Sequence, residues 1–284
     1  MSHKPFALVL AGGGARGYAH VGVIKALEHA GLVPSGLVGV SMGAIVAATY
    51  AARTDWYEAL LRVEVDGAAG PGSGDGLAAA PARPCGRAWA RARTAWNLVR
   101  GWGGPDEAQE VAMGVLDELV GEARLEEGRV PVKVCATDLI SGSRVEMSTG
   151  PSASALYASS ALAGLLPPLE RGDALLADGV YADIAPVDVA RGMGVPLVVV
   201  VDPGQPTDAE GITNGLQAVM RAMEICHQSH AHLRVGGADL TIHPVFHQYI
   251  DVLDFGSRRN CVASGWKATR RLMDELRRVL GASD

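Results

Sequence analysis

Short apolar runs alternate with stretches of helical spacing from the start of the chain. The run FALVLA at 6–11 ends in glycines, and the segment after it spaces its apolar residues as a helix does until Gly31. A second apolar run ends at Ser41, and the small residues MGAIVAATYAART continue from it as a second helix. The pattern therefore predicts a strand, a tight turn and a helix, followed by a second unit of the same kind.

The same alternation continues through the rest of the chain, with no internal repeat. Buried strands that alternate with helices are typical of a mostly parallel sheet with helices on both faces, so the sequence predicts an α/β fold. The further predicted elements are a helix near 107–124, strands at 130–138 and 144–148, a helix after Pro151, a strand at 195–202, a helix near 213–235, a strand at 239–244 and an amphipathic helix from about 257 to 280.

The segment 66–106 departs from this pattern, because Gly, Ala, Pro and Arg dominate it. Such a composition does not hold a strand, and we expect a mobile cap or linker there. Its tryptophans at 89, 96 and 102 either pack the cap or rest on a membrane surface. With 284 residues, 48% of them apolar, the chain can bury one large core, so we expect a single domain over 1–284 with the cap inserted in it.

Composition excludes several classes of partner. A formal net charge of -6 provides no general attraction to polyanions, so no nucleic acid partner is expected. The four cysteines lie far apart without a C-x-x-C pair, which indicates reduced thiols; they are Cys85, Cys135, Cys226 and Cys261. The sequence begins without a secretory leader and contains no apolar stretch of roughly 18 to 20 residues, so we expect a cytoplasmic protein whose membrane contact, if any, is peripheral.

The turn after the first strand has the form G-x-G-x-x-G, a fingerprint of dinucleotide-binding proteins; it reads Gly12-Gly13-Gly14-Ala15-Arg16-Gly17. A dinucleotide site also needs an acidic residue at the end of the second strand, where it binds the ribose hydroxyls. That strand ends at Ser41, and the nearest acid, Glu28, falls inside the first helix. A nucleotide-dependent oxidoreductase is therefore a disfavoured alternative.

The second strand ends instead in a G-x-S-x-G motif, formed by Gly39, Ser41 and Gly43. At a strand-to-helix junction the flanking glycines permit a sharp turn that projects the serine hydroxyl, although a small-residue packing turn has the same pattern. Two successive units in a parallel sheet bring the glycine turn and Ser41 side by side. The backbone N–H groups of the glycine turn and of Met42 then suit the oxyanion formed when Ser41 attacks an ester.

Two kinds of base remain open for such a serine. A late histidine, His243 or His247, would complete a triad of the α/β-hydrolase type, but Ser41 follows only the second strand and the glycine turn lacks the His of H-G-G-G. Asp178 ends an apolar run and enters an Asp-Gly turn with Gly179. Partial burial would raise its pKa and make it a workable base, while the plain alternative is a turn-forming Asp-Gly.

Four blocks in this order resemble the patatin-like phospholipase family, in particular its small bacterial members. The blocks are LVLAGGGARGYAHVGVIKALEHAGL, GVSMGAIVAATYA, VKVCATDLISGSRVEMSTG followed by ALYASSALAGLLPPLE, and ADGVYADIAPVDVARGMGVPLVVVVD. They span most of the chain, and the ordered set is far more specific than any one block.

The resemblance implies a three-layer α/β/α fold and a serine acyl hydrolase that cleaves lipid acyl esters through a Ser-Asp dyad, here Ser41 and Asp178. The matching oxyanion stretch comprises Gly12, Gly13, Gly14, Ala15, Arg16 and Gly17. Arg16 matches a basic residue of that stretch, which either orients the loop or meets a phosphate headgroup. The chain differs from the family at Val180, where a β-branched residue follows Asp-Gly, so the turn is expected to differ slightly.

We expect no cofactor and no bound metal. A metal site is the alternative for Cys226, His227, His230 and His232, but their spacing on a helix fits one poorly, and a solvated helix face is favoured. Fold alone does not establish function, so a noncatalytic interaction protein that keeps the fold also remains an alternative. The presence of both Ser41 and Asp178 favours the hydrolase.

Overall fold

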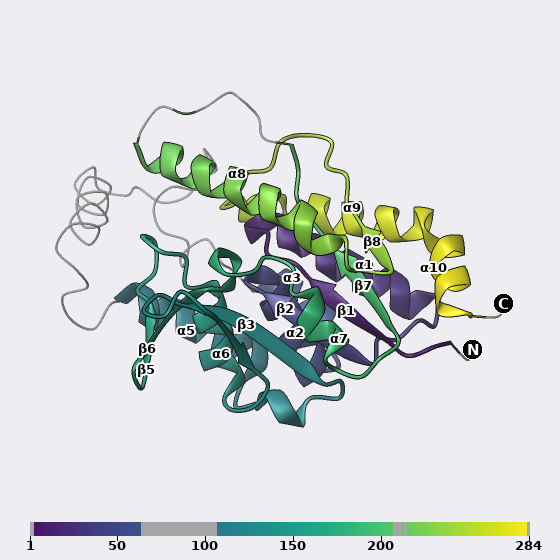
Figure 1. The fold of residues 1–284 in the computed structure, drawn as a ribbon, viewed down its shortest axis with the longest axis horizontal. Helices are drawn as coiled ribbons and strands as arrows, with labels where there is room; N and C mark the ends of the chain where they lie inside the picture. The colour runs from purple at the N-terminus through teal and green to yellow at the C-terminus, as the bar shows by residue number, and fades with distance from the viewer. Residues whose placement is uncertain (1–2, 64–106, 207–211, 213–214, 283–284) are drawn as a thin grey trace.

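The computed structural model of this chain describes residues 3–63, 107–206, 212 and 215–282. A central sheet crosses the molecule with helices on either side, and the first and last described segments lie near each other (Figure 1). The Lys4 N–H donates to the Leu280 carbonyl oxygen at 2.8 Å, which ties the two terminal segments together. The cap predicted at 66–106 and its three tryptophans lie outside the described residues, so the cap and the single-domain organisation stay predictions.

The sheet contains both parallel and antiparallel pairs. Hydrogen-bonded pairs link the strands in the order β5-β6-β3-β2-β1-β7-β8, and β4 also pairs with β3. The pairs β3–β2, β2–β1, β1–β7 and β7–β8 are parallel, and the pairs of β3 with β4 and β6 and of β5 with β6 are antiparallel. This confirms the mostly parallel sheet predicted from the sequence. The strands are β1 (Phe6–Leu10), β2 (Gly36–Val40), β3 (Val132–Asp138), β4 (Arg144–Met147), β5 (Leu169–Arg171), β6 (Ala174–Asp178), β7 (Leu197–Val201) and β8 (Leu240–Ile242).

The register on β3 decides where β2 and β6 end. β2 runs parallel to β3 and ends with Val40 opposite Cys135, whereas β6 runs antiparallel and ends with Asp178 opposite Ala136. β4 pairs with both Cys135 and Ala136, so it occupies the other edge of β3. The carboxyl ends of β2 and β6 therefore point toward each other and meet along one edge of β3.

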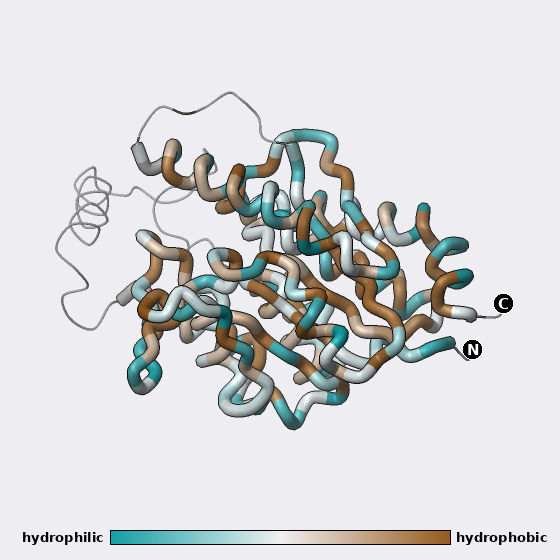
Figure 2. The backbone as a smooth tube through the Cα atoms, viewed as in Figure 1, coloured by the Kyte–Doolittle hydropathy of each residue, from teal (hydrophilic) through white to brown (hydrophobic). Residues whose placement is uncertain are grey.

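Helices cover both faces of this sheet. Along β1, Phe6, Leu8 and Leu10 belong to one buried apolar cluster while Ala7 and Val9 belong to another, as the period of two in a strand requires. The first cluster includes residues of α1, α2, α3, α5, α6, α9 and α10, and the second includes residues of α7 and α8. Hydrophobic residues concentrate in the strands between them (Figure 2), and the architecture has three layers, α/β/α.

The α-helices follow the sequence prediction in most places. They are α1 (Ala19–His29), α2 (Met42–Ala52), α3 (Trp56–Arg62), α5 (Glu107–Val120), α6 (Ser152–Ser160), α7 (Val187–Arg191), α8 (Gly215–Val235), α9 (Arg258–Arg271) and α10 (Met273–Leu280). Short 3-10 helices occur at η1 (Gly14–Tyr18), η2 (Leu125–Glu127), η3 (Gly179–Tyr181) and η4 (Phe255–Ser257). Across the described ranges, none of the helices has the length and apolar content needed to cross a membrane.

The structure differs from the sequence prediction in short elements and at the C-terminal helix. α3, α7 and β5 are too short for periodicity to reveal. The helix predicted from about 257 to 280 is wrong as one element, because it divides into α9 and α10 at Leu272, where ψ is 8°. After that break Met273, Leu276 and Leu280 face the core.

α9 packs closely against α1 through two glycines. A Cβ atom at Gly265 of α9 would lie 1.9 Å from the Ala19 carbonyl oxygen, and one at Gly22 of α1 would lie 1.9 Å from the Val262 carbonyl oxygen. Only glycines at these positions allow the two backbones to approach so closely. Because α1 begins directly after the glycine turn, this packing helps to hold the turn in place.

We expect the substitution Gly265→Ala to destabilise the protein by about 1–3 kcal/mol, since the new methyl group must push α9 away from α1. Gly114→Ala is the matched control, because a Cβ at Gly114 on α5 would have nothing within 4 Å. That change should raise stability by up to about 1 kcal/mol, the usual gain of Ala over Gly in a helix. Urea denaturation measures both, and a Gly265→Ala variant as stable as the wild type would contradict the close packing.

Candidate active site

The G-x-S-x-G motif forms a strained turn between β2 and α2. Ser41 has φ 55° and ψ −126°, and it is the one non-glycine residue with positive φ in the described ranges. Such a conformation costs of order 1–3 kcal/mol and persists only when its surroundings impose it. A Cβ at Gly43 would lie 2.1 Å from the Leu10 carbonyl oxygen, and one at Gly39 would lie 2.4 Å from the Ala44 Cα. Gly43 is therefore needed for the turn to fit against the end of β1, and Gly39 for it to fit against the start of α2.

The meeting of β2 and β6 brings Ser41 to Asp178. The Ser41 hydroxyl donates a hydrogen bond to Asp178 Oδ2 at 2.7 Å. Both residues are buried, Ser41 at 8% exposure and Asp178 at 2%. The two side chains are therefore within the hydrogen-bond reach that general-base catalysis requires of a hydroxyl and a carboxylate.

Hydrogen bonds and a close backbone approach hold the Asp178 turn in place. Asp178 Oδ1 accepts a hydrogen bond from the Val180 N–H at 3.0 Å, and the Asp178 carbonyl oxygen accepts one from the Thr137 hydroxyl at 2.8 Å. A Cβ at Gly179 would lie 2.3 Å from the Cys135 carbonyl oxygen, so this turn also needs glycine. Val180 lies in η3 and has no positive φ, so its β-branched side chain fits the turn without backbone strain.

Burial dominates the electrostatics of Asp178. Desolvation raises the pKa of its carboxyl to about 7, and the hydrogen bonds from Ser41 and from the Val180 N–H oppose this rise. Near neutral pH its ionised and protonated forms are therefore both populated. A group that is to take a proton and later return it must be able to adopt both forms.

The glycine turn lies beside Ser41, but two of its N–H groups have structural partners. The Gly12 N–H donates to the Ile184 carbonyl oxygen at 3.1 Å, and the Ala15 N–H donates to the Val252 carbonyl oxygen at 2.8 Å. These two donors hold the turn against its neighbours. They are not free to face an oxyanion, which narrows the set of donors expected from the sequence.

The remaining candidate donors are Gly13, Gly14 and Met42. The Gly13 N–H has no hydrogen-bond partner in the part of the chain that the structure describes. Gly14 and Met42 stand at the first positions of η1 and α2, where a helix supplies no acceptor. Gly17 has a packing role, because a Cβ there would lie 2.6 Å from Met42 Cγ.

Sequence reasoning missed two buried side chains that support this site. The Ser41 N–H donates to Ser159 Oγ at 2.9 Å, and that hydroxyl donates to the Cys135 carbonyl oxygen at 2.7 Å. The His20 Nε2 bonds to the Ala11 carbonyl oxygen at 2.8 Å, and burial lowers the His20 pKa to about 4, so the ring is neutral and donates. Ser159 lies in one of the family-like blocks, but nothing in the sequence indicates its partner.

The late histidines are not partners of the serine. The Ser41 hydroxyl bonds to Asp178, while His243 Nδ1 lies 3.5 Å from Asp202 Oδ2 and His247 is exposed. Glu28 lies on α1, where its carboxylate is 3.8 Å from Arg129 Nη2. It therefore takes no position at the end of β2, as a ribose-binding acid would.

A cavity of about 510 Å³ opens at Ser41 and Asp178. Apolar side chains of α2, α3, α5 and the segment 162–166 form much of its wall, among them Ile45, Leu60, Val115, Leu116, Leu119 and Leu166. Polar lining comes from α8 and from the ends of β7 and β8, and includes Asp202, Gln205, Glu224, His227, Gln228 and His243. Such a cavity suits a ligand with a long apolar part and a polar part.

The solvated helix face predicted for the α8 histidines is wrong for His227. This ring is partly buried, lines the cavity and lies 5.8 Å from the Tyr181 ring, because α8 covers the site. Burial lowers the His227 pKa to about 4. Within the described ranges no group of three His, Cys, Asp or Glu residues could hold a metal ion, and the thiols of Cys135, Cys226 and Cys261 are free.

Comparisons with known proteins give the family and the fold that this chain resembles. A family model described as patatin-like phospholipase matches residues 8–191. The chain is 33% identical over 216 residues to an uncharacterized NTE family protein of Mycobacterium tuberculosis (72% of this chain, 52% of that protein). It is 35% identical over 202 residues to the lysophospholipase nte1 of Aspergillus fumigatus (71% of this chain, 12% of that protein). Among solved structures, VipD from Legionella pneumophila has a similar fold, with a TM-score of 0.55 and 16% identity over 96% of this chain and 67% of that one. The chain thus spans about half the length of the mycobacterial relative and a small part of the fungal one.

We expect the reactivity of Ser41 toward a fluorophosphonate probe to rise with pH, with a midpoint near the Asp178 pKa of about 7. Only the ionised carboxylate can accept the serine proton, so the labelling rate at pH 6 should be about a tenth of the rate at pH 8. Intact-mass spectrometry measures the rate, with Ser41→Ala as background. A rate that stays flat across this range would contradict the prediction that Asp178 is the base.

The titration of Asp178 can also be measured independently, through the stability of the protein as a function of pH. The pKa of Asp178 is about 7 in the folded protein against an ordinary value of 3.8, so the bound proton stabilises the fold at low pH. This contribution is fully present below the ordinary value and is lost as pH rises through about 7. Asp178→Asn stays neutral at every pH, so its melting temperature relative to that of the wild type should increase as pH rises from about 4 to 8.

We expect Ser159→Ala to slow the labelling of Ser41 by about 10- to 100-fold, because an unpaired buried N–H costs roughly 1–3 kcal/mol and the strained turn can relax to avoid it. Thr269→Val on α9 is the matched control, since it removes a buried hydroxyl that donates to the Gly265 carbonyl oxygen at 3.0 Å. The control should lose stability and keep its labelling rate. Equal labelling rates in Ser159→Ala and the wild type would show that Ser159 does not position Ser41.

Proposed function

Because the chain belongs to the patatin-like phospholipase family, we propose that it hydrolyses acyl esters of lipids with Ser41 as nucleophile and Asp178 as its base. The observation that carries the proposal is the hydrogen bond of 2.7 Å between the two buried side chains. The strained backbone of Ser41 supports it, since proteins keep such conformations mainly at functional sites. No histidine is required in this scheme.

The reaction proceeds in two halves through an acyl-enzyme. Ser41 Oγ attacks the ester carbonyl carbon while its proton passes to Asp178 Oδ2, and the carbonyl oxygen becomes an oxyanion. The N–H groups of Gly13, Gly14 and Met42 are the candidate donors to that oxyanion. When the tetrahedral intermediate collapses, the bond to the leaving alcohol breaks and Asp178 returns the proton to the alcohol oxygen. A water molecule then repeats these steps on the acyl-enzyme, releasing the fatty acid and restoring the Ser41 hydroxyl.

The cavity supports a lipid as the ester. Its apolar wall from α2, α3 and α5 can accept an acyl chain next to Ser41, while the polar residues of α8 and of the ends of β7 and β8 face the other part of the substrate. The fungal relative is named a lysophospholipase, which supports a reaction of the phospholipase A or lysophospholipase type. Phospholipids and lysophospholipids are therefore the first substrates to test.

The two alternatives find less support in the site. A dinucleotide-binding enzyme would need an acid at the end of β2, where Ser41 stands, and Glu28 is held in α1 near Arg129. A noncatalytic interaction protein has no need for a serine in a costly conformation or for a buried carboxylate at hydrogen-bond distance from it. The hydrolase explains both features.

To test the proposal, hydrolysis of p-nitrophenyl acyl esters from short to long chains is measured for the wild type, Ser41→Ala and Asp178→Asn. We expect both substitutions to reduce kcat/KM by roughly a thousandfold or more, as is usual when one of two catalytic residues that act together is removed. His243→Ala and His247→Ala should keep turnover. Turnover by the wild type that persists in Ser41→Ala, or that depends on a histidine instead of Asp178, would overturn the proposed dyad.

A further inference from the structure

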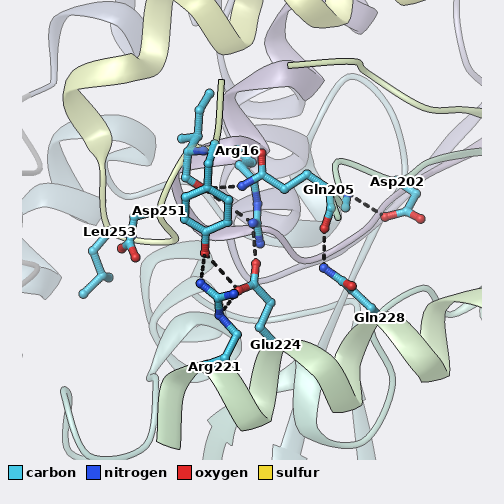
Figure 3. A network of polar contacts seen from close by, with 11 residues as sticks. Arg16, Asp202, Gln205, Arg221, Glu224, Gln228, Asp251 and Leu253 are labelled. Carbon is cyan, nitrogen blue, oxygen red and sulfur yellow. Dashed lines mark hydrogen bonds and ion pairs between the residues drawn. The ribbon is translucent and has the colours of Figure 1, made fainter. Parts of the chain in front are cut away.

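The glycine turn contains a buried positive charge, that of Arg16. Arg16 is 5% exposed, and its Nη1 donates to Oε1 of Glu224, a residue of α8 that is itself 6% exposed (Figure 3). The same Nη1 lies 3.5 Å from the Ile250 carbonyl oxygen, and Arg16 Nε is buried without a partner in the described residues. A buried charge is tolerated only when it is paired, so the position of Arg16 depends on Glu224.

Glu224 is held in turn by its second carboxylate oxygen. Oε2 accepts a hydrogen bond from the Tyr249 hydroxyl at 3.1 Å and lies 3.5 Å from Arg221 Nε. Arg221 Nη2 also donates to the Tyr249 hydroxyl at 3.2 Å. Figure 3 shows both guanidinium groups turned toward Glu224. Both oxygens of Glu224 are therefore occupied, and its side chain has little freedom to move.

The segment after β8 holds the backbone of the same turn. The Ala15 N–H donates to the Val252 carbonyl oxygen at 2.8 Å, and a Cβ at Gly14 would lie 2.3 Å from that oxygen. Gln205 fixes this segment in place, because its amide donates to the Ile250 carbonyl oxygen at 2.6 Å and accepts from the Ile250 N–H at 3.3 Å (Figure 3). The turn is thus attached both through the Arg16 side chain and through its backbone.

Arg16, through which the turn is attached to α8, lies next to the candidate oxyanion donors in the sequence. Gly13 and Gly14 precede Arg16 by three and two residues in η1 and its cap. If the Arg16 side chain lost its partner, the guanidinium would move toward water and carry these backbone groups with it. Electrostatic stabilisation of an oxyanion depends on donors held in place before the reaction, so a small displacement would slow the chemical step.

We propose that Glu224 is a positioning residue for hydrolysis: through Arg16 it holds the N–H groups of Gly13 and Gly14 where the oxyanion forms. The inference rests on the proposed function of Ser41 and Asp178. It makes α8 a part of the catalytic apparatus and gives Arg16 the role of orienting the turn.

The test compares Glu224→Gln with the wild type on the p-nitrophenyl ester that the wild type hydrolyses fastest. Glu224→Gln keeps the size of the side chain and removes its charge. We expect kcat to fall about 10- to 100-fold while KM changes less than about threefold, because the lost interaction acts in the transition state. An Arg16→Gln variant and the double variant complete a cycle. The double variant should be no slower than the slower single variant, since both changes break one interaction.

Two further variants separate positioning from general stability. Asp239→Asn removes another carboxylate that pairs with an arginine, Arg191, at 2.8 Å, but at the amino end of β8, away from the site. It should lower the melting temperature and leave kcat unchanged. Tyr249→Phe removes one hydrogen bond to Glu224 without leaving a buried charge unpaired, so it tests the idea even if Glu224→Gln folds poorly. We expect a fall in kcat of about two- to fivefold at constant KM.

Labelling of Ser41 by a fluorophosphonate, measured in parallel, distinguishes failure of this inference from failure of the proposed function. The labelling transition state also places negative charge on an oxygen at the same donors, and it does not depend on any particular ester. A wild type that is labelled but turns over no ester would count against the proposed function, while slower labelling of Glu224→Gln would still support positioning. Unchanged kcat and labelling in Glu224→Gln, additive effects in the double variant, or a change confined to KM would overturn the inference.

Discussion

The site depends on the register with which β2 and β6 meet along one edge of β3. Val40 ends β2 opposite Cys135, and Asp178 ends β6 opposite Ala136. The two adjoining strand ends therefore place the Ser41 hydroxyl and the Asp178 carboxylate 2.7 Å apart. A shift of one residue in either strand would turn the side chains to opposite faces of the sheet. The parallel pairing of β2 and the antiparallel pairing of β6 are both needed, which explains why the sheet is not uniformly parallel.

The meeting of these strand ends places two energetically unfavourable features side by side: the positive φ of Ser41 and the buried carboxyl of Asp178. The surrounding residues offset the cost of both. Ser41 adopts a positive φ that only a crowded turn can impose, and Gly39 and Gly43 make that crowding possible by leaving room for the backbone of β1 and α2. The buried carboxyl of Asp178 has a pKa raised to about 7 by desolvation, so it tolerates burial by holding a proton part of the time. The same compromise makes it suited to exchange a proton with Ser41.

The glycine turn provides the third component, and its place is decided from outside the sheet. His20 and Ile184 hold its start, Val252 holds its middle, and Glu224 pairs with Arg16. α8 therefore lines the cavity and anchors the turn at once. Because Arg16 and Glu224 belong to one buried polar network, we expect the position of α8 and the geometry of the candidate oxyanion donors to change together.

The sequence by itself determined the order of the longer strands and helices and the two glycine-flanked turns, and it offered Ser41 and Asp178 as a candidate pair. The element order and the two turns rest on local constraints, such as the period of apolar residues and backbone approaches that only glycine permits, which a sequence pattern records. The candidate pairing of Ser41 with Asp178 rests instead on the resemblance of four ordered blocks to one family, since the two residues lie 137 positions apart. The tertiary structure alone decided which N–H groups of the turn stay free, that the last helix breaks at Leu272, and that Ser159 and Glu224 support the site. Ser159 lies 118 residues from Ser41 and Glu224 lies 208 residues from Arg16, so their contacts exist only after the sheet and α8 are assembled. A serine or a glutamate in a helix has the same local pattern whether it faces water or a buried partner, and for that reason no sequence pattern could identify either one.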